Sequence, residues 1–99
     1  MEYHKTDQTL FVKLKSDLTY PSVKKLETLV NVEDIESLVI DLTEAKIVDS
    51  EGIRFIYTVM KEGVQITLVN PPYIFDKIVD ILKLKSYMKD LKIVREERR

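Results

Sequence analysis

The sequence contains no cysteine and no tryptophan, and among its 99 residues it has one histidine, two glycines and three prolines. Without cysteine, the chain forms neither a disulfide nor a thiolate metal site. No His/carboxylate spacing typical of a metal site is present, and no glycine-rich loop that would cradle phosphates. We therefore expect no metal, no cofactor and no enzymatic activity of the hydrolase, transferase or redox classes.

An excess of positive charge is also missing. Sixteen Lys and Arg residues face 17 Asp and Glu residues, which leaves a net charge of -1. A nucleic-acid binder would show a basic excess gathered on one face, so we expect no nucleic-acid partner. No apolar run approaches the length of a membrane span, and "MEYHKTDQ" at the N-terminus is too polar for a signal peptide. The expected localisation is cytoplasmic, without direct membrane insertion.

The length and the apolar content describe one small domain over residues 1–99. Hydrophobic residues make up 44% of the chain, enough for a single core, which we expect between about residues 9 and 94. The final "REERR", residues 95–99, mixes charges of both signs and predicts a frayed, solvated tail. A monomer or a weak dimer is compatible with this composition.

Short apolar runs predict the strands. They cover residues 9–15, 37–42, 64–69 and 91–94, and residues 2–6 are a hairpin partner for the first of them. The run over 37–42 is continuously apolar, which is expected of a strand covered on both faces.

Apolar residues at helical spacing predict helices over residues 20–31, 50–63 and 70–84. Pro21 suits the first turn of the first helix, and Gly63 supplies the stop of the second. Asn70 is the expected cap of the third, followed by proline at its first position. The order β-β-α-β-α-β-α-β predicts an α/β domain with a mixed, largely parallel sheet and three to four helices. In such sheets, function tends to lie at the carboxyl ends of the strands.

One stretch near such an end, "AKIVDSEGIRFIY" over residues 45–57, places a serine between two acids at the start of a helix. Asp49 or Ser50 can cap the free N–H groups of the first turn, and Glu51 adds a favourable charge there. Gly52 allows the close approach of another backbone. The same geometry suits a switch, because a phosphate on Ser50 would add about -1.5 to -2 charges and repel a protein surface docked over the loop.

These residues resemble the STAS domain family, which includes bacterial anti-sigma factor antagonists and the tails of sulfate transporters. The family pattern is an apolar strand ending in Asp-Leu-Ser, a short connection, and Asp-Ser-Ser-Gly opening a helix. The matching residues are Asp41-Leu42-Thr43 and Asp49-Ser50-Glu51-Gly52, and further on Pro71, Pro72 and Phe75 match a proline-containing turn and a helix. The resemblance implies phosphorylation at Ser50 by a partner that is both anti-sigma factor and kinase.

The sequence departs from the family pattern at two places on the surface used for partner contact. Glu51 stands where the family has a second serine. Ser16 and Thr19 stand in "SDLT" where many antagonists have the glycine and aspartate of Gly-x-Leu-Asp.

The resulting hypothesis is a non-enzymatic regulatory module, a transcription-regulating phosphoprotein that binds a protein partner. The residues expected at the partner surface are Asp49, Ser50, Glu51, Gly52, Phe55, Val59, Thr19 and Tyr20. For Phe55 and Val59, beside the apolar stripe of their helix, packing against a neighbouring helix is the alternative to a partly exposed docking patch. Tyr73 has the same two interpretations.

Two other functions remain open from the sequence. The chain could be a STAS subunit of a transport or signalling complex without a phosphorylation switch. It could instead bind a small ligand or a nucleotide, using the helix N-terminus as an anion site, although the neighbouring acids oppose that. His4 is too remote from Asp49 and Ser50 in the sequence, and too near the chain end, to suggest a catalytic triad, and no Gly-x-Ser-x-Gly motif is present.

Overall fold

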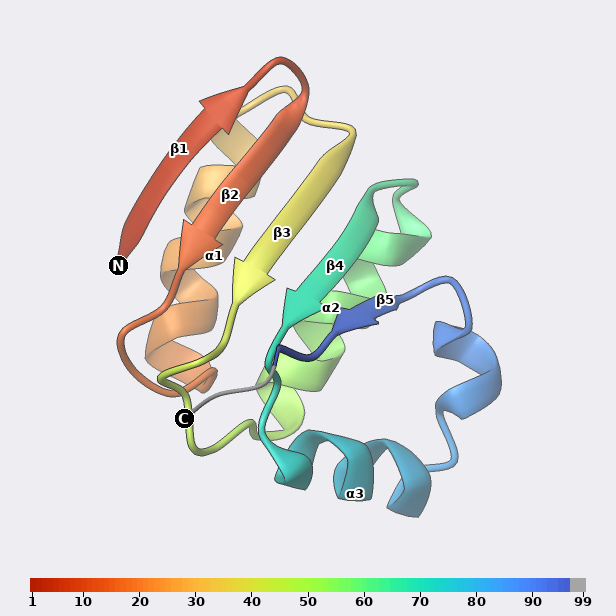
Figure 1. The fold of residues 1–99 in the computed structure, drawn as a ribbon. Coiled ribbons are helices and arrows are strands. Elements are labelled where there is room, and N and C mark those ends of the chain that lie inside the picture. Colours follow the sequence, from red (N-terminus) through yellow and green to blue (C-terminus); the bar gives the residue numbers. More distant parts are fainter. Residues whose placement is uncertain (97–99) are drawn as a thin grey trace.

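A five-stranded sheet with the order β1-β2-β3-β4-β5 forms the centre of the protein (Figure 1). The computed structural model describes residues 1–96. Strand β1 (Glu2–Thr6) is antiparallel to β2 (Thr9–Lys13), and the remaining neighbours are parallel. These are β3 (Ser37–Asp41), β4 (Gln65–Val69) and β5 (Lys92–Val94). The predicted α/β class, with its mixed and largely parallel sheet, is confirmed.

The helices follow the strands in the predicted order. They are α1 (Tyr20–Val32), α2 (Ser50–Lys61) and α3 (Tyr73–Ile81), and a short 3₁₀ helix, η1 (Lys85–Met88), precedes the last strand. Helices α1 and α2 lie side by side behind the sheet in Figure 1. The loops that lead into α1, α2 and α3 all leave the sheet at the edge where the parallel strands end. The structure therefore gathers these three loops at one end of the molecule.

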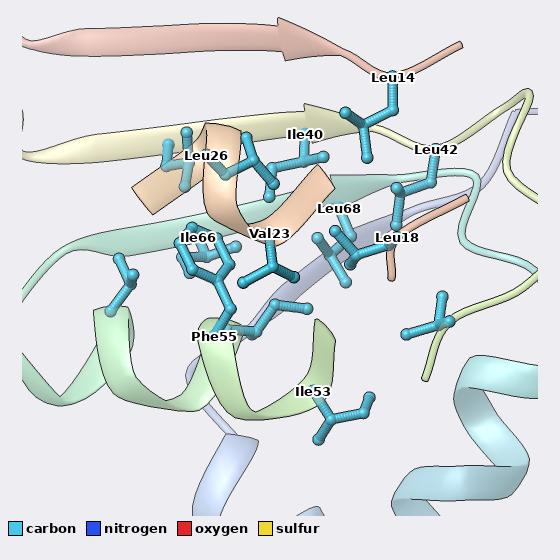
Figure 2. Packing of buried hydrophobic residues seen from close by; sticks show 14 of the residues in the cluster. Leu14, Leu18, Val23, Leu26, Ile40, Leu42, Ile53, Phe55, Ile66 and Leu68 are labelled. Carbon is cyan, nitrogen blue, oxygen red and sulfur yellow. The ribbon is translucent and has the colours of Figure 1, made fainter. Parts of the chain in front are cut away.

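The core lies between the sheet and the helices. Alternate residues of the central strands are buried, among them Leu10 and Leu38. Figure 2 shows Ile40, Ile66 and Leu68 on the side of the sheet that faces α1 and α2. The residues between them remain partly exposed, so in β3 every second side chain is only half-covered. The expectation that β3 is covered on both faces was wrong, because within residues 1–96 no helix lies over the front face of the sheet.

The start of α3 differs from the prediction. The helix begins at Tyr73 with Pro72 as its cap, and no side chain caps it. Asn70 instead takes a left-handed backbone conformation with φ 53°, and its side chain joins two distant segments. Its Nδ2 donates to Thr43 Oγ1 at 2.9 Å, and its Oδ1 accepts from the Glu96 N–H at 2.7 Å. Asn70 therefore holds the loops at the carboxyl edge together. The sequence did not indicate this role, because an asparagine followed by two prolines is also typical of a helix cap.

Arg95 and Glu96, the first two residues of the predicted frayed tail, are held in place by hydrogen bonds. Arg95 donates to the Pro71 carbonyl oxygen and to the Asp76 carboxylate, both at 2.6 Å, and it stacks over the ring of Tyr73. These bonds tie the end of β5 to the first turn of α3. Residues 97–99, the rest of the predicted tail, lie outside the described residues.

No helix within residues 1–96 combines the length and the apolar content needed to span a membrane. The same residues contain no cluster of three or more His, Cys, Asp or Glu side chains arranged to hold a metal ion.

Candidate functional site

Two loops at the carboxyl edge of the sheet run side by side, the one before α1 and the one before α2. Leu18 and Val48 form an isolated parallel bridge. The Leu18 N–H donates to the Ile47 carbonyl at 3.0 Å, and the Asp49 N–H donates to the Leu18 carbonyl at 3.2 Å. This pairing brings the predicted residues Thr19 and Asp49 into one surface, although they are far apart in the sequence.

Asp17 fixes the two loops together and was missed by the sequence reasoning. Its Oδ1 accepts from the backbone N–H groups of Lys46, at 2.8 Å, and Ile47, at 3.1 Å. Its backbone carbonyl accepts a hydrogen bond of 2.7 Å from the buried Ser22 hydroxyl. The one sequence feature that indicated such a role is the aspartate in "SDLT", because aspartate side chains in loops often accept hydrogen bonds from nearby backbone N–H groups. Here its partners lie about thirty residues away, so local rules could not identify them.

At the start of α2, Asp49 rather than Ser50 is the cap. Asp49 Oδ1 accepts from the Gly52 N–H at 2.9 Å, and Asp49 has the extended backbone typical of an N-cap. Ser50 is the first helical residue and is exposed. Its hydroxyl forms no side-chain hydrogen bond within residues 1–96. Asp49 therefore caps the helix, and the Ser50 hydroxyl remains accessible at the surface.

This division of roles predicts unequal effects of two alanine substitutions. Asp49→Ala should lower the free energy of unfolding by about 0.5–2 kcal/mol, the usual loss of an N-cap. Ser50→Ala should stay within about 0.5 kcal/mol of the unmodified chain, as expected for an exposed site. Urea denaturation of the two purified variants measures both values. Equal losses would mean that both side chains contribute to the cap.

Gly52 lies in the first turn of α2, against the loop before α1. A Cβ at this position would be 2.7 Å from the Leu18 carbonyl oxygen and 2.9 Å from Leu18 Cγ. Both distances are too short for real contacts, and Leu18 is fully buried, so it has little freedom to move. The predicted close approach of another backbone is therefore what the structure shows at Gly52.

Glu51 is half-buried and forms an ion pair within its own helix. Arg54 Nη1 lies 3.6 Å from Glu51 Oε2, and the two side chains are 71% and 42% exposed, respectively. A long pair with this exposure is weak and easily rearranged. The fixed negative charge next to Ser50 is thus partly balanced by the exposed guanidinium of Arg54.

Phe55 and Val59 do not form the docking patch that was expected as one interpretation. They are only 4% and 3% exposed, and Phe55 points from α2 into the core in Figure 2. Phe55 lines two adjacent hollows between α1 and α2, and Val59 lines one of them. The alternative, packing against a neighbouring helix, is correct because α1 covers this flank of α2.

The exposed apolar side chains at this edge come from other residues. Tyr20 is 56% exposed with Lys24 over its ring, and Thr19, the cap residue of α1, is half-buried. Ile47 is 52% exposed although its neighbour Val48 is buried, and Tyr73 is 79% exposed. Sequence patterns treated Ile47 and Val48 alike, because the loop that turns one of them outward is not periodic.

A family model described as the STAS domain matches residues 1–98. A solved structure of the anti-sigma factor antagonist SpoIIAA in its unphosphorylated form superposes with a TM-score of 0.65. The alignment covers 99% of this chain and 88% of that chain at 13% sequence identity, so it concerns the fold. A search of curated proteins found no match.

Proposed function

The chain belongs to the STAS domain family, and from that premise we propose that it is a non-enzymatic regulatory module switched by phosphorylation of Ser50. In this proposal its partner is a cytoplasmic protein of the anti-sigma factor and serine-kinase type. The partner docks over the surface formed by Asp49, Ser50, Glu51 and the adjoining Thr19–Tyr20 segment. The proposal of a regulatory module switched by phosphorylation is supported by the similar fold of SpoIIAA, which is described as an anti-sigma factor antagonist in its unphosphorylated form.

The observation that carries the proposal is the position of the Ser50 hydroxyl. Ser50 is exposed on a rigid helix start, and the capping bond there is made by Asp49. A kinase can therefore approach the hydroxyl, and its modification breaks no hydrogen bond within residues 1–96.

The docking surface in this proposal differs from the one expected from the sequence. Phe55 and Val59 are excluded because they are buried, and Ile47 takes their place as the exposed apolar anchor beside Ser50. Tyr20 supplies an aromatic ring, the type of side chain that often dominates binding energy. A small apolar centre surrounded by charges is typical of transient protein interfaces.

Phosphorylation would act on binding rather than on folding. A helix N-terminus tolerates a phosphate, because its free N–H groups and its dipole favour an anion. The docked partner would instead meet a cluster of negative charge from the phosphate, Asp49 and Glu51. The Asp49 carboxylate already accepts the Gly52 N–H, which also disfavours a free anion or a nucleotide as the ligand of this helix end.

The test uses extract from the source cells and ³²P-labelled ATP. The unmodified chain should become labelled in extract, Ser50→Ala should not, and neither should be labelled by ATP alone. Pull-down with the chain should recover an ATP-binding kinase. Recovery of membrane transporter subunits, without labelling, would favour a STAS subunit of a transport complex. Labelling of Ser50→Ala to the same extent would rule out Ser50 as the site.

A further inference from the structure

Arg54 is placed to contact either Glu51 or Ser50. Residues three and four positions apart are neighbours on a helix surface, so Arg54 is adjacent to both. In the unmodified chain its partner is Glu51, at 3.6 Å. Because Arg54 is 71% exposed and the ion pair is long, little is lost when the guanidinium turns to another anion.

A phosphate on Ser50 would compete strongly for this guanidinium. It carries about -1.5 to -2 charges against the single charge of Glu51, and it offers three acceptor oxygens. Arginine binds phosphate with two parallel hydrogen bonds, which a carboxylate 3.6 Å away does not receive here. We propose that Arg54 is a switching residue that pairs with Glu51 before phosphorylation and with the Ser50 phosphate after it.

The exchange of partners by Arg54 would also change the charge of a surface that Ser50 does not line. Glu51 and Arg54 line a groove of about 360 Å³ between α1 and α2, together with Tyr20, Lys24 and Glu27. In that groove Lys24 already pairs with Glu27, at 3.7 Å. When Arg54 leaves, Glu51 loses its cation. The groove, which Ser50 does not line, then holds the negative charge of Glu51 without its Arg54 partner.

This role of Arg54 rests on the proposed function, since Ser50 must carry the phosphate, and the test therefore supplies the phosphate directly. Phosphoserine is encoded at position 50, and the phosphate is titrated by ³¹P NMR. Its second pKa lies near 6 when unperturbed. Arg54→Gln should raise the phosphate pKa by about 0.2–0.7 of a pH unit, which is the usual strength of an exposed pair converted at 1.36 kcal/mol per unit. Arg54→Lys, which keeps the charge, should recover part of the shift.

Lys61→Gln is the matched control, because it removes one positive charge from the opposite end of the same helix. It should leave the phosphate pKa unchanged. The side-chain Nε–H signal of Arg54 should also move when Ser50 is phosphorylated. An equal phosphate pKa in the unmodified and Arg54→Gln chains, or an equal shift from Lys61→Gln, would overturn the role of Arg54. Partner titrations of the same phosphorylated chains judge the proposed function separately, because the phosphate can block docking without Arg54.

Discussion

Gly52→Val should destabilise the protein by about 1–3 kcal/mol or more, the range for forcing extra atoms into a packed site. The new side chain would begin 2.7 Å from the Leu18 carbonyl oxygen. That carbonyl accepts the Asp49 N–H, and the Leu18 side chain is fully buried, so neither can withdraw without breaking the contact between the two loops. For a domain of this size, each kcal/mol lowers the melting temperature by roughly 4–8 °C.

Helix propensity alone predicts the opposite sign for a smaller change at the same position. Replacing a helical glycine with alanine ordinarily stabilises a helix by about 0.5–1 kcal/mol. Gly52→Ala should instead destabilise, because its Cβ is the atom that clashes. Glu51→Ala is the neighbouring control and should cost about 0.3–1 kcal/mol, the size of a helix-end charge effect. Thermal melts of the three variants measure these differences in stability. A Gly52→Val chain as stable as Glu51→Ala would show that the loop before α1 shifts to accommodate the new side chain.

The sequence was sufficient for the elements whose signals are local. The apolar pattern identified α1, α2, α3 and the strands β2 to β5 in the right order, whereas β1 was expected only as a hairpin partner of β2; Pro21 marked the start of α1. Gly63 marked the end of α2, and its φ of 92° is the left-handed conformation that this stop requires. The position of Ser50 at a helix start was likewise readable, because strand end, acids and helix period follow one another within a few residues.

The features that escaped prediction depend on partners distant in the sequence. Asn70 was predicted to cap α3, yet its side chain forms hydrogen bonds with Thr43 and Glu96, which are 27 and 26 residues away. Asp49 and Ser50 are both good cap residues, and only the local backbone path decides between them. Helical spacing showed that Phe55 widens the apolar face of α2, but which flank α1 covers is set by the packing of two helices on the sheet.

Ser50→Asp should weaken partner binding by a few kcal/mol while leaving the fold intact. The substitution places three consecutive carboxylates, at positions 49, 50 and 51, on the proposed docking surface. Like charges or an unpaired buried charge at an interface cost several kcal/mol, which corresponds to a loss of roughly a hundredfold or more in affinity. The fold should tolerate the change, because the new carboxylate stands at the N-terminus of α2, where the helix dipole favours it.

Ser50→Ala is the matched variant for this measurement. It removes the hydroxyl without adding charge, so it should bind the partner like the unmodified chain and resist the kinase. Titration calorimetry at low and moderate salt separates the two causes of weaker binding, because repulsion between exposed charges is screened by salt whereas the burial of an unpaired charge is not. A Ser50→Asp chain that binds as tightly as Ser50→Ala would leave Ser50 as an ordinary first residue of α2. The docking surface would then have to be sought away from this loop.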